Sequence, residues 1–165
     1  MGDIKAKTYL EKLGFADSDK KMSEHDIIQA WVYKNIKTIL DETIMSKNPK
    51  PYEITNVKWE HQIIYTNGYN NQTLIGFADL MVSYKCEFFN KHADSYQMED
   101  GQIIIEIKTK IPDLGSVIRQ MRTYQVYQKH YRTQYLVVSP DDRFTEILKE
   151  QGFWFYKYND PTKLF

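Results

Sequence analysis

The sequence of 165 residues is poor in cysteine and has no long apolar run, and each shortage excludes a class of protein. Cys86 is the single cysteine, so an internal disulfide framework is excluded and we expect a reducing, cytoplasmic environment. Every apolar run is far shorter than the ~18 to 20 residues of a membrane helix, and no basic region with an apolar core marks a secretion signal. We therefore expect no membrane partner.

The motifs of several enzyme classes are also missing. The four histidines (His25, His61, His92 and His130) lack the spacing of a zinc motif, and Cys86 has no companion for a CxxC pair. No glycine-rich phosphate loop is present. A zinc enzyme, a thiol hydrolase and a phosphate-loop protein therefore have no support in the sequence.

Acidic residues are absent from Leu114 to Pro140, although Lys plus Arg and Asp plus Glu each total 22 over the whole chain. In this segment tyrosines are interleaved with basic residues, which are Arg119, Arg122, Lys129 and Arg132. Such a pattern is typical of a surface that binds nucleic-acid phosphates and stacks on bases. A solvated helix face is the alternative interpretation.

The spacing of apolar residues predicts an α/β fold, in which helices flank a mixed β-sheet. The expected elements are a helix over 23–40, a hairpin or meander over 56–89, a strand over 102–110, a helix over 114–130, a strand over 133–140, a helix over 144–152 and a strand over 153–158. Three successive strands imply antiparallel neighbours, whereas a strand, a helix and a strand imply a parallel crossover.

We expect residues 1–165 to form a single domain, because no repeat or Gly/Ser-rich linker divides them. Residues 1–22 would be an N-terminal extension with a short helix near 5–13. The core would span about 23–140, with a polar loop at 90–101, and 141–165 would add the C-terminal helix and strand.

A charged pair interrupts the most apolar strand, GQIIIEIKTK. Glu106 and Lys108 are two residues apart, so on a strand they point to the same face. Burying two charges costs several kcal/mol per ion unless a partner charge, a metal or a substrate compensates. A structural ion pair is one interpretation, and a catalytic site is the other.

A second acid, Asp79, interrupts the apolar strand LIGFADLMV. If the two strands are neighbours, Asp79 and Glu106 repel each other, and one pKa rises unless a cation lies between them. Mg²⁺, for which Mn²⁺ can substitute, takes oxygen ligands and keeps bound water. Lys108 could then orient the attacking water and neutralise charge on a phosphate.

This arrangement resembles the PD-(D/E)XK nuclease superfamily, whose restriction-endonuclease-like core has the order αβββαβ. Asp79 and Glu106-Ile107-Lys108 match its motif, although Ala78 stands where proline is usual. The RecB-like branch often lacks that proline and has a glycine three residues before the aspartate, as Gly76 is here. The resemblance implies that Asp79, Glu106 and the main-chain carbonyl of Ile107 bind Mg²⁺.

The same branch adds a glutamine and a tyrosine on the next helix, which Gln120-Met121-Arg122-Thr123-Tyr124 matches. Gln120 and Tyr124 are four residues apart and share a helix face, where they could hydrogen-bond the catalytic strand or DNA. The alternative is a helix that packs on the sheet through Met121 and Tyr124, with Gln120 at its border.

The first helix offers one more metal ligand. Glu24 lies three and four residues before Ile27 and Ile28, which indicates that it points toward the apolar face. SEHDIIQ is similar to the opening of small phage-type nucleases, where that glutamate contributes to the site. Glu24 could instead complement the helix dipole. His25 is the substitute in the RecB-like branch, and at about 100° per residue we expect only one of the two side chains to point inward.

Together these features predict a Mg²⁺-dependent nuclease of DNA, either an exonuclease or an endonuclease. By analogy its setting would be phage, mobile-element, repair or defence DNA processing, with a homo-oligomer or a helicase or recombination protein as partner. A non-catalytic binding module of the same fold, such as a phage-encoded inhibitor, is the first alternative. A restriction-type endonuclease that reads sequence through residues 90–101 is the second.

Overall fold

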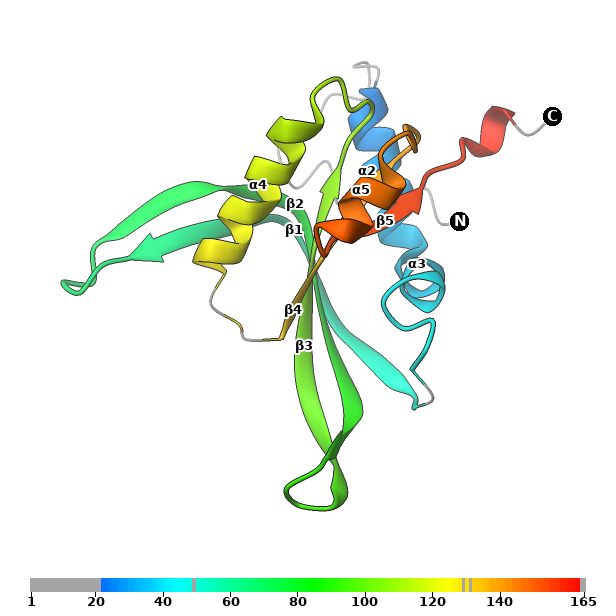
Figure 1. Ribbon diagram of the computed structural model, residues 1–165. Coiled ribbons are helices and arrows are strands. Elements are labelled where there is room, and N and C mark those ends of the chain that lie inside the picture. The colour runs from blue at the N-terminus through cyan, green and yellow to red at the C-terminus, as the bar shows by residue number, and fades with distance from the viewer. Residues whose placement is uncertain (1–21, 49, 129, 131, 164–165) are drawn as a thin grey trace.

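A five-stranded mixed sheet forms the centre of the computed structural model, which describes residues 22–48, 50–128, 130 and 132–163. Its strands, in spatial order, are β1 (Tyr52–Thr66), β2 (Gln72–Asn90), β3 (Ser95–Ile107), β4 (Thr133–Ser139) and β5 (Trp154–Lys157). The first three pair antiparallel, and β3, β4 and β5 pair parallel, as predicted (Figure 1). The predicted helix near 5–13 lies outside the described residues.

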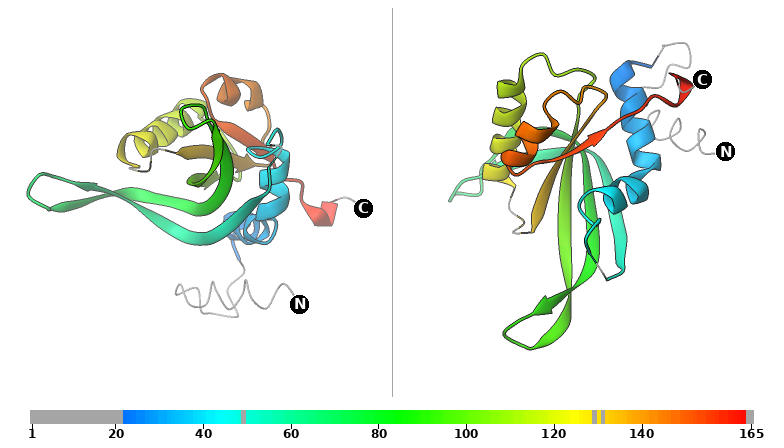
Figure 2. Two further views of the ribbon diagram at one scale, coloured as in Figure 1. Left: turned by 90° about the horizontal axis from the view of Figure 1, so that it is seen from below. Right: turned by 45° about the vertical axis from the view of Figure 1, so that its right-hand side comes forward.

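Helices cover both faces of the sheet and confirm the predicted α/β class (Figure 2). They are α2 (Glu24–Lys34), α3 (Ile36–Glu42), α4 (Leu114–Tyr127) and α5 (Thr145–Glu150), followed by the short 3-10 helix η1 (Pro161–Lys163). Ile103 and Ile105 of β3 pack against α2 and α3, whereas Ile104 packs against α4 and α5. The strand is buried on both faces because successive side chains alternate.

The predicted first helix is divided into two. The Ser23 hydroxyl accepts the main-chain N–H of Asp26 at 3.2 Å and caps the start of α2, in agreement with the sequence. Asn35 then ends α2 with a φ of −111°, and its side-chain amide donates to the Trp31 carbonyl at 2.8 Å. This local bond offers the backbone an alternative to the helix and separates α2 from α3.

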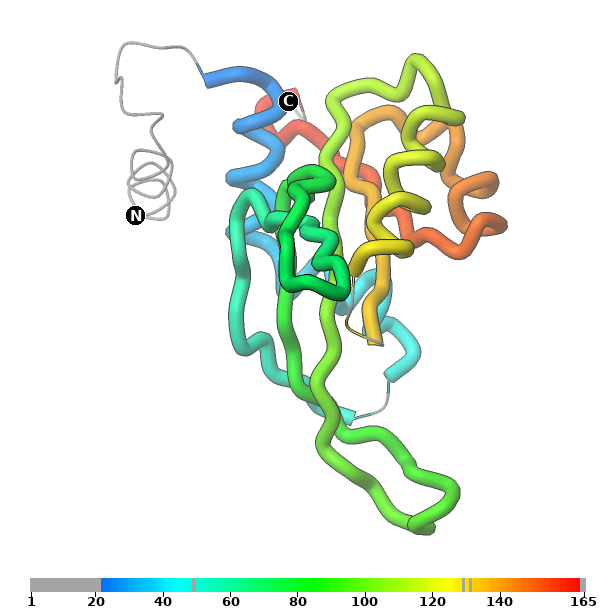
Figure 3. The backbone as a smooth tube through the Cα atoms, turned by 90° about the vertical axis from the view of Figure 1, so that its left-hand side faces the viewer, coloured from blue at the N-terminus to red at the C-terminus, as the bar shows by residue number. Residues whose placement is uncertain are grey.

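The predicted loop at 90–101 is wrong, because most of it is strand. β2 extends to Asn90 and β3 begins at Ser95, so only 91–94 turn the chain. Across this hairpin the rings of Phe89 and Tyr96 lie 5.4 Å apart between centroids. Figures 1 and 3 show that the β1–β2 and β2–β3 hairpins both project from the body, in different directions.

The C-terminal elements follow the sequence pattern. Gly152 adopts a φ of 84°, a left-handed conformation that glycine tolerates, and it ends α5 as predicted. None of the helices in the described ranges is long and apolar enough to cross a membrane.

Candidate active site

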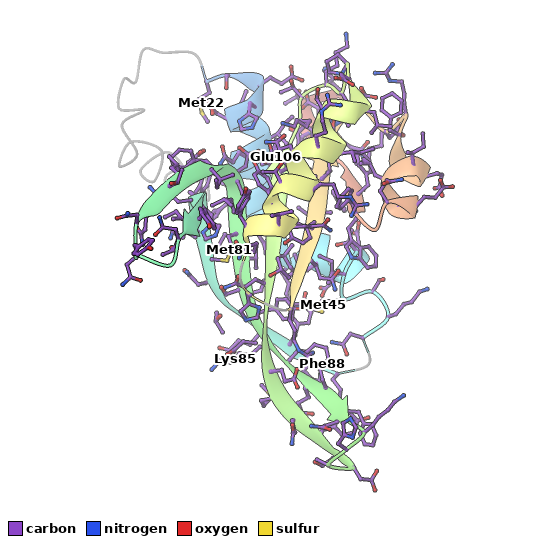
Figure 4. The ribbon with its side chains drawn as sticks, turned by 60° about the vertical axis from the view of Figure 1, so that its left-hand side comes forward. Met22, Met45, Met81, Lys85, Phe88 and Glu106 are labelled. Atoms are coloured by element: carbon purple, nitrogen blue, oxygen red, sulfur yellow. The ribbon has the colours of Figure 1, made fainter. Side chains whose placement is uncertain are left out.

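Glu106 is a buried acid on β3, with 4% of its surface exposed. Its neighbours Ile105 and Ile107 face α2 and α3, so Glu106 turns toward α4 with Ile104. Lys108, just after the strand, points the same way and places Nζ 2.8 Å from Oε1 of Glu106. The predicted same-face arrangement is therefore confirmed, and Figure 4 shows Glu106 beside α4 and far from Phe88 on the projecting hairpin.

Helix α4 contributes two further contacts to this carboxylate. Nε2 of Gln120 donates to Oε1 of Glu106 and to the Tyr124 hydroxyl, each at 2.7 Å. The Tyr124 hydroxyl lies 2.8 Å from the Phe77 carbonyl and 3.1 Å from Oε2 of Glu106. Val117, Met121 and Tyr124 are buried on the sheet, so helix packing and the polar contacts use one face of α4.

Asp79 joins the cluster from the neighbouring strand β2. Its Oδ2 accepts the main-chain N–H of Ile107 at 2.7 Å, which fixes the carboxylate against β3. Its Oδ1 lies 3.2 Å from Nε2 of His25, on α2. The sheet therefore brings Asp79, Glu106 and Lys108 together, and helices from opposite faces supply His25 and Gln120.

Electrostatics in the cluster reflect burial and the proximity of two acids. Burial and the negative charge of Asp79 raise the pKa of Glu106 to about 7, although Lys108 acts in the opposite direction. Burial also raises the pKa of Tyr124, so its hydroxyl keeps its proton. The hydrogen bond to Asp79 raises the pKa of His25 despite partial burial. Perturbed groups in one place are typical of functional sites.

The structure places His25, and not Glu24, beside the acids. Glu24 is exposed on the first turn of α2, and Ile27, three residues on, is 48% exposed. His25 lies three and four residues before the buried Ile28 and Gln29 and so faces the sheet. The prediction that Glu24 points inward depends on placing Ile27 on the buried face, and Ile27 lies on the exposed side instead.

Gln29 and Glu60 border the cluster, and neither is among the predicted site residues. Nε2 of the buried Gln29 donates to the Asp79 carbonyl at 2.9 Å and to Oε1 of Glu60 at 3.2 Å. Glu60 has a φ of 48°, a left-handed conformation that is strained for this residue. An amide within the apolar stripe of α2, beside Ile28, was the available signal for Gln29.

The predicted basic residues do not gather at the cluster. Arg119 is an exposed side chain near Asp113, with Nη2 at 3.4 Å from the carboxylate. Arg122 donates to the Gln151 carbonyl at 2.8 Å and stacks over the Phe153 ring. Arg132 pairs with Glu99 and stacks over Phe88. Lys129 lies outside the described residues. Arg122 and Arg132 therefore make contacts within the protein.

The oxygen donors of the cluster fit a hard divalent cation, although they are few. Among the described residues, no group of three or more His, Cys, Asp or Glu side chains is arranged to hold a metal ion. Burial and the charge of Asp79 raise the pKa of Glu106 even with Lys108 in contact, and a cation near the two acids would lower it. Mg²⁺ is commonly bound by only one or two carboxylates, with water and substrate phosphate as its other ligands.

No protein-family model matches the sequence, and no curated protein matches it. Two solved structures are similar to this chain in backbone structure. A repair endonuclease from Pyrococcus abyssi is 17% identical, with a TM-score of 0.47, and the match covers 88% of this chain and 50% of that one. EndoMS in complex with double-stranded DNA is 11% identical, with a TM-score of 0.39 and coverage of 88% and 49%. This chain spans about half the length of each of the two structures. At such low identity the similarity does not show which activity this chain has.

Proposed function

We propose that this protein is a divalent-metal-dependent nuclease of the PD-(D/E)XK type that hydrolyses phosphodiester bonds of DNA. One observation carries the proposal: the carboxylate of Glu106 is buried, lies near Asp79 and is held by Lys108, Gln120 and Tyr124. Such burial costs several kcal/mol per ion. A structural ion pair explains the contact with Lys108 but leaves Asp79 and the contacts from α4 unexplained.

Asp79, Glu106 and the main-chain carbonyl of Ile107 are the groups that would hold Mg²⁺ or Mn²⁺. When bound, such an ion polarises a phosphoryl oxygen and lowers the pKa of a bound water. The hydrogen bond from Ile107 holds Asp79, and those from Gln120 and Tyr124 hold Glu106, so both carboxylates are oriented in advance. Contacts of this kind to metal ligands support affinity and activity.

Lys108 is the group best placed to act on the substrate. Its side chain is 27% exposed, whereas that of Glu106 is 5% exposed, so the ammonium lies at the rim of the cluster. A phosphate that reached this rim would meet a positive charge beside the buried acids. Lys108 would orient the attacking water and stabilise the negative charge that develops on the phosphate oxygens.

His25 is the group of α2 that we assign to the site in place of Glu24. Its contact with Asp79 lets it orient that carboxylate or hold a proton at Nε2. Because the imidazole is 35% exposed, it can also meet a substrate phosphate at the edge of the cluster. In either role it completes a site built from the sheet and from helices on both faces.

The proposal is tested by incubating the full chain with end-labelled single- and double-stranded DNA in Mg²⁺, Mn²⁺ or EDTA. We expect cleavage with either metal and none in EDTA. Single-nucleotide products would identify an exonuclease, and internal fragments an endonuclease. Single- and double-stranded DNA that both remain intact with either metal would refute the proposal.

A further inference from the structure

A concave region lies between the part of the β1–β2 hairpin nearest its turn and the C-terminal end of α4. It has a volume of about 490 Å³ and is lined by His61, Gln62, Gln72, Gln102, Tyr127 and Gln128, among other residues. We call these six residues the amide pocket. Gln120, Tyr124 and Gln128 follow at intervals of four, so the Glu106 cluster and the amide pocket lie along one face of the helix.

The cavity is polar, and His130 lines it together with the six residues of the amide pocket. Among the described residues that line it, none is Lys, Arg, Asp or Glu. Burial lowers the pKa of His61, so its imidazole is neutral at neutral pH. A phosphate or carboxylate ligand would need charged donors, which these residues do not supply. Amides instead offer donors and acceptors side by side, which is the pattern on the edge of a nucleobase.

Contacts between three elements hold these amides in place. Nε2 of His61 on β1 lies 3.3 Å from Oε1 of Gln128, and Nε2 of Gln128 donates to Oε1 of Gln102 on β3 at 2.6 Å. At the rim, the side chain of Gln72 is exposed and makes no hydrogen bond within the described part of the chain. It is available to a ligand.

An aromatic surface adjoins the amides. The rings of Tyr65 and Tyr127 meet edge to face, with 5.8 Å between centroids, and Tyr65 is 46% exposed. Exposed aromatic rings provide surfaces on which bases stack, a contribution that does not depend on the identity of the base. Stacking surface and fixed amides are the two components from which single-stranded nucleic acid is commonly recognised.

We propose that the amide pocket holds one unpaired nucleobase of the DNA strand that is cleaved at the Glu106 cluster. The inference rests on the proposed nuclease function. Gln102 and Glu106 are four residues apart on β3, a separation of about 13 Å. This is roughly four base steps of a DNA strand. A base within a few nucleotides of the scissile phosphate therefore reaches the pocket, and only an unpaired base has its hydrogen-bonding edge free.

The test compares two DNA duplexes that differ at one position. One carries 2-aminopurine as an unpaired base, and the other carries it paired with thymine. Binding is measured in Mg²⁺ with the Lys108→Ala protein, so that the DNA stays intact. We expect a change in 2-aminopurine fluorescence with the first duplex and about tenfold tighter binding than with the second. Equal affinity for the two duplexes would overturn the proposal that the amide pocket binds an unpaired base.

Two variants in the Lys108→Ala background test which residues are responsible. Gln128→Leu breaks the contacts to His61 and Gln102, and Gln72→Leu changes an exposed side chain and leaves the fold undisturbed. Both should lower the affinity ratio of the two duplexes toward one. Gln125→Leu, on α4 but outside the pocket, should keep it. A ratio that neither pocket variant changes would reject the inference.

Cleavage by the unmodified protein separates the two proposals. Metal-dependent cleavage combined with an affinity ratio of one would support the nuclease function and reject the base-binding role of the amide pocket. A preference for the unpaired base that depends on Gln72 and Gln128, without cleavage of any DNA, would keep the pocket and reject the nuclease.

Discussion

Nε2 of Gln120 donates to Oε1 of Glu106 over 2.7 Å and so joins helix α4 to the buried acid of strand β3. Lys108 contacts the same oxygen, and Tyr124 contacts the other one. Side chains of other residues therefore contact both oxygens of the Glu106 carboxylate. The orientation of Glu106 depends on how α4 packs, and substitutions on that helix should act on the site at a distance.

Gln120→Leu keeps the approximate size of the side chain but removes the hydrogen bonds to Glu106 and Tyr124. Loss of a group that orients a metal ligand typically costs about 10- to 100-fold in metal affinity or activity. We expect a decrease of this size in single-turnover cleavage with Mg²⁺. Gln125→Leu on the same helix is the control, and equal rates for the two variants would show that the contact has no functional role.

Glu106 should make the metal-free protein less stable as the pH rises. Its pKa is about 7 in the folded chain against an ordinary value of 4.5, so the folded state binds the extra proton between these values. The free energy of unfolding then falls from about pH 4.5 to 7, by on the order of 3 kcal/mol. His25, whose pKa is also raised, adds a loss of the same sign above its ordinary value of 6.5.

Glu106→Gln removes the titrating group, so its unfolding free energy should depend less on pH than that of the parent. Urea unfolding in EDTA at pH 5 and pH 8 measures this difference. The exposed Glu146, whose side chain is 82% accessible, provides the control Glu146→Gln, which should keep the parental dependence. An unchanged dependence in Glu106→Gln would contradict the assigned protonation.

Divalent metal should stabilise the folded protein through Asp79 and Glu106. A ligand that binds only the folded state raises the melting temperature, by about 2 to 4 °C for each kcal/mol in a chain of this size. Asp79→Asn should abolish the increase produced by millimolar Mg²⁺. Asp141→Asn is a matched control, because Asp141 likewise accepts a main-chain N–H, that of Ile111. A parental melting temperature that Mg²⁺ leaves unchanged would exclude the site.

Gly101 on β3 tests the packing of the Tyr84 ring, which belongs to its cross-strand partner on β2. A Cβ at this position would lie 2.2 Å from the ring of Tyr84, which is buried with 4% exposure. Because a buried ring cannot move freely, Gly101→Ala should destabilise the protein by about 1 to 3 kcal/mol. A Cβ at Gly68 meets nothing within 4 Å, so Gly68→Ala is the control in chemical denaturation. Equal stability of the two variants would contradict this packing.

The order of most elements could be predicted from the sequence, because most have a strong local signal. Ser23 caps α2, the Asn67-Gly68 turn follows β1, and Gly152 ends α5. The segment 95–101 has no such signal. It is largely exposed on both faces, so its strand conformation depends on pairing with β2 rather than on burial of one face.

The candidate site was predictable only in part. Asp79, Glu106 and Lys108 stand out because a charge within an apolar strand is conspicuous, and Gln120 and Tyr124 match a helical spacing. The choice between Glu24 and His25 depends on the rotation of α2 against the sheet, which a stripe containing both Ile27 and Ile28 leaves undetermined. Arg122 and Arg132 look like phosphate ligands until their neighbours in space, Gln151 and Glu99, are known.

The most direct measurement of the central claim is cleavage of end-labelled DNA in Mg²⁺ by Lys108→Ala and Lys110→Ala. Lys110 is an exposed lysine two residues further along, outside the cluster. We predict that Lys108→Ala loses metal-dependent cleavage and that Lys110→Ala cleaves at the parental rate. Cleavage by Lys108→Ala at the parental rate would contradict the assignment, since Glu106 and Lys108 would then be only a structural pair.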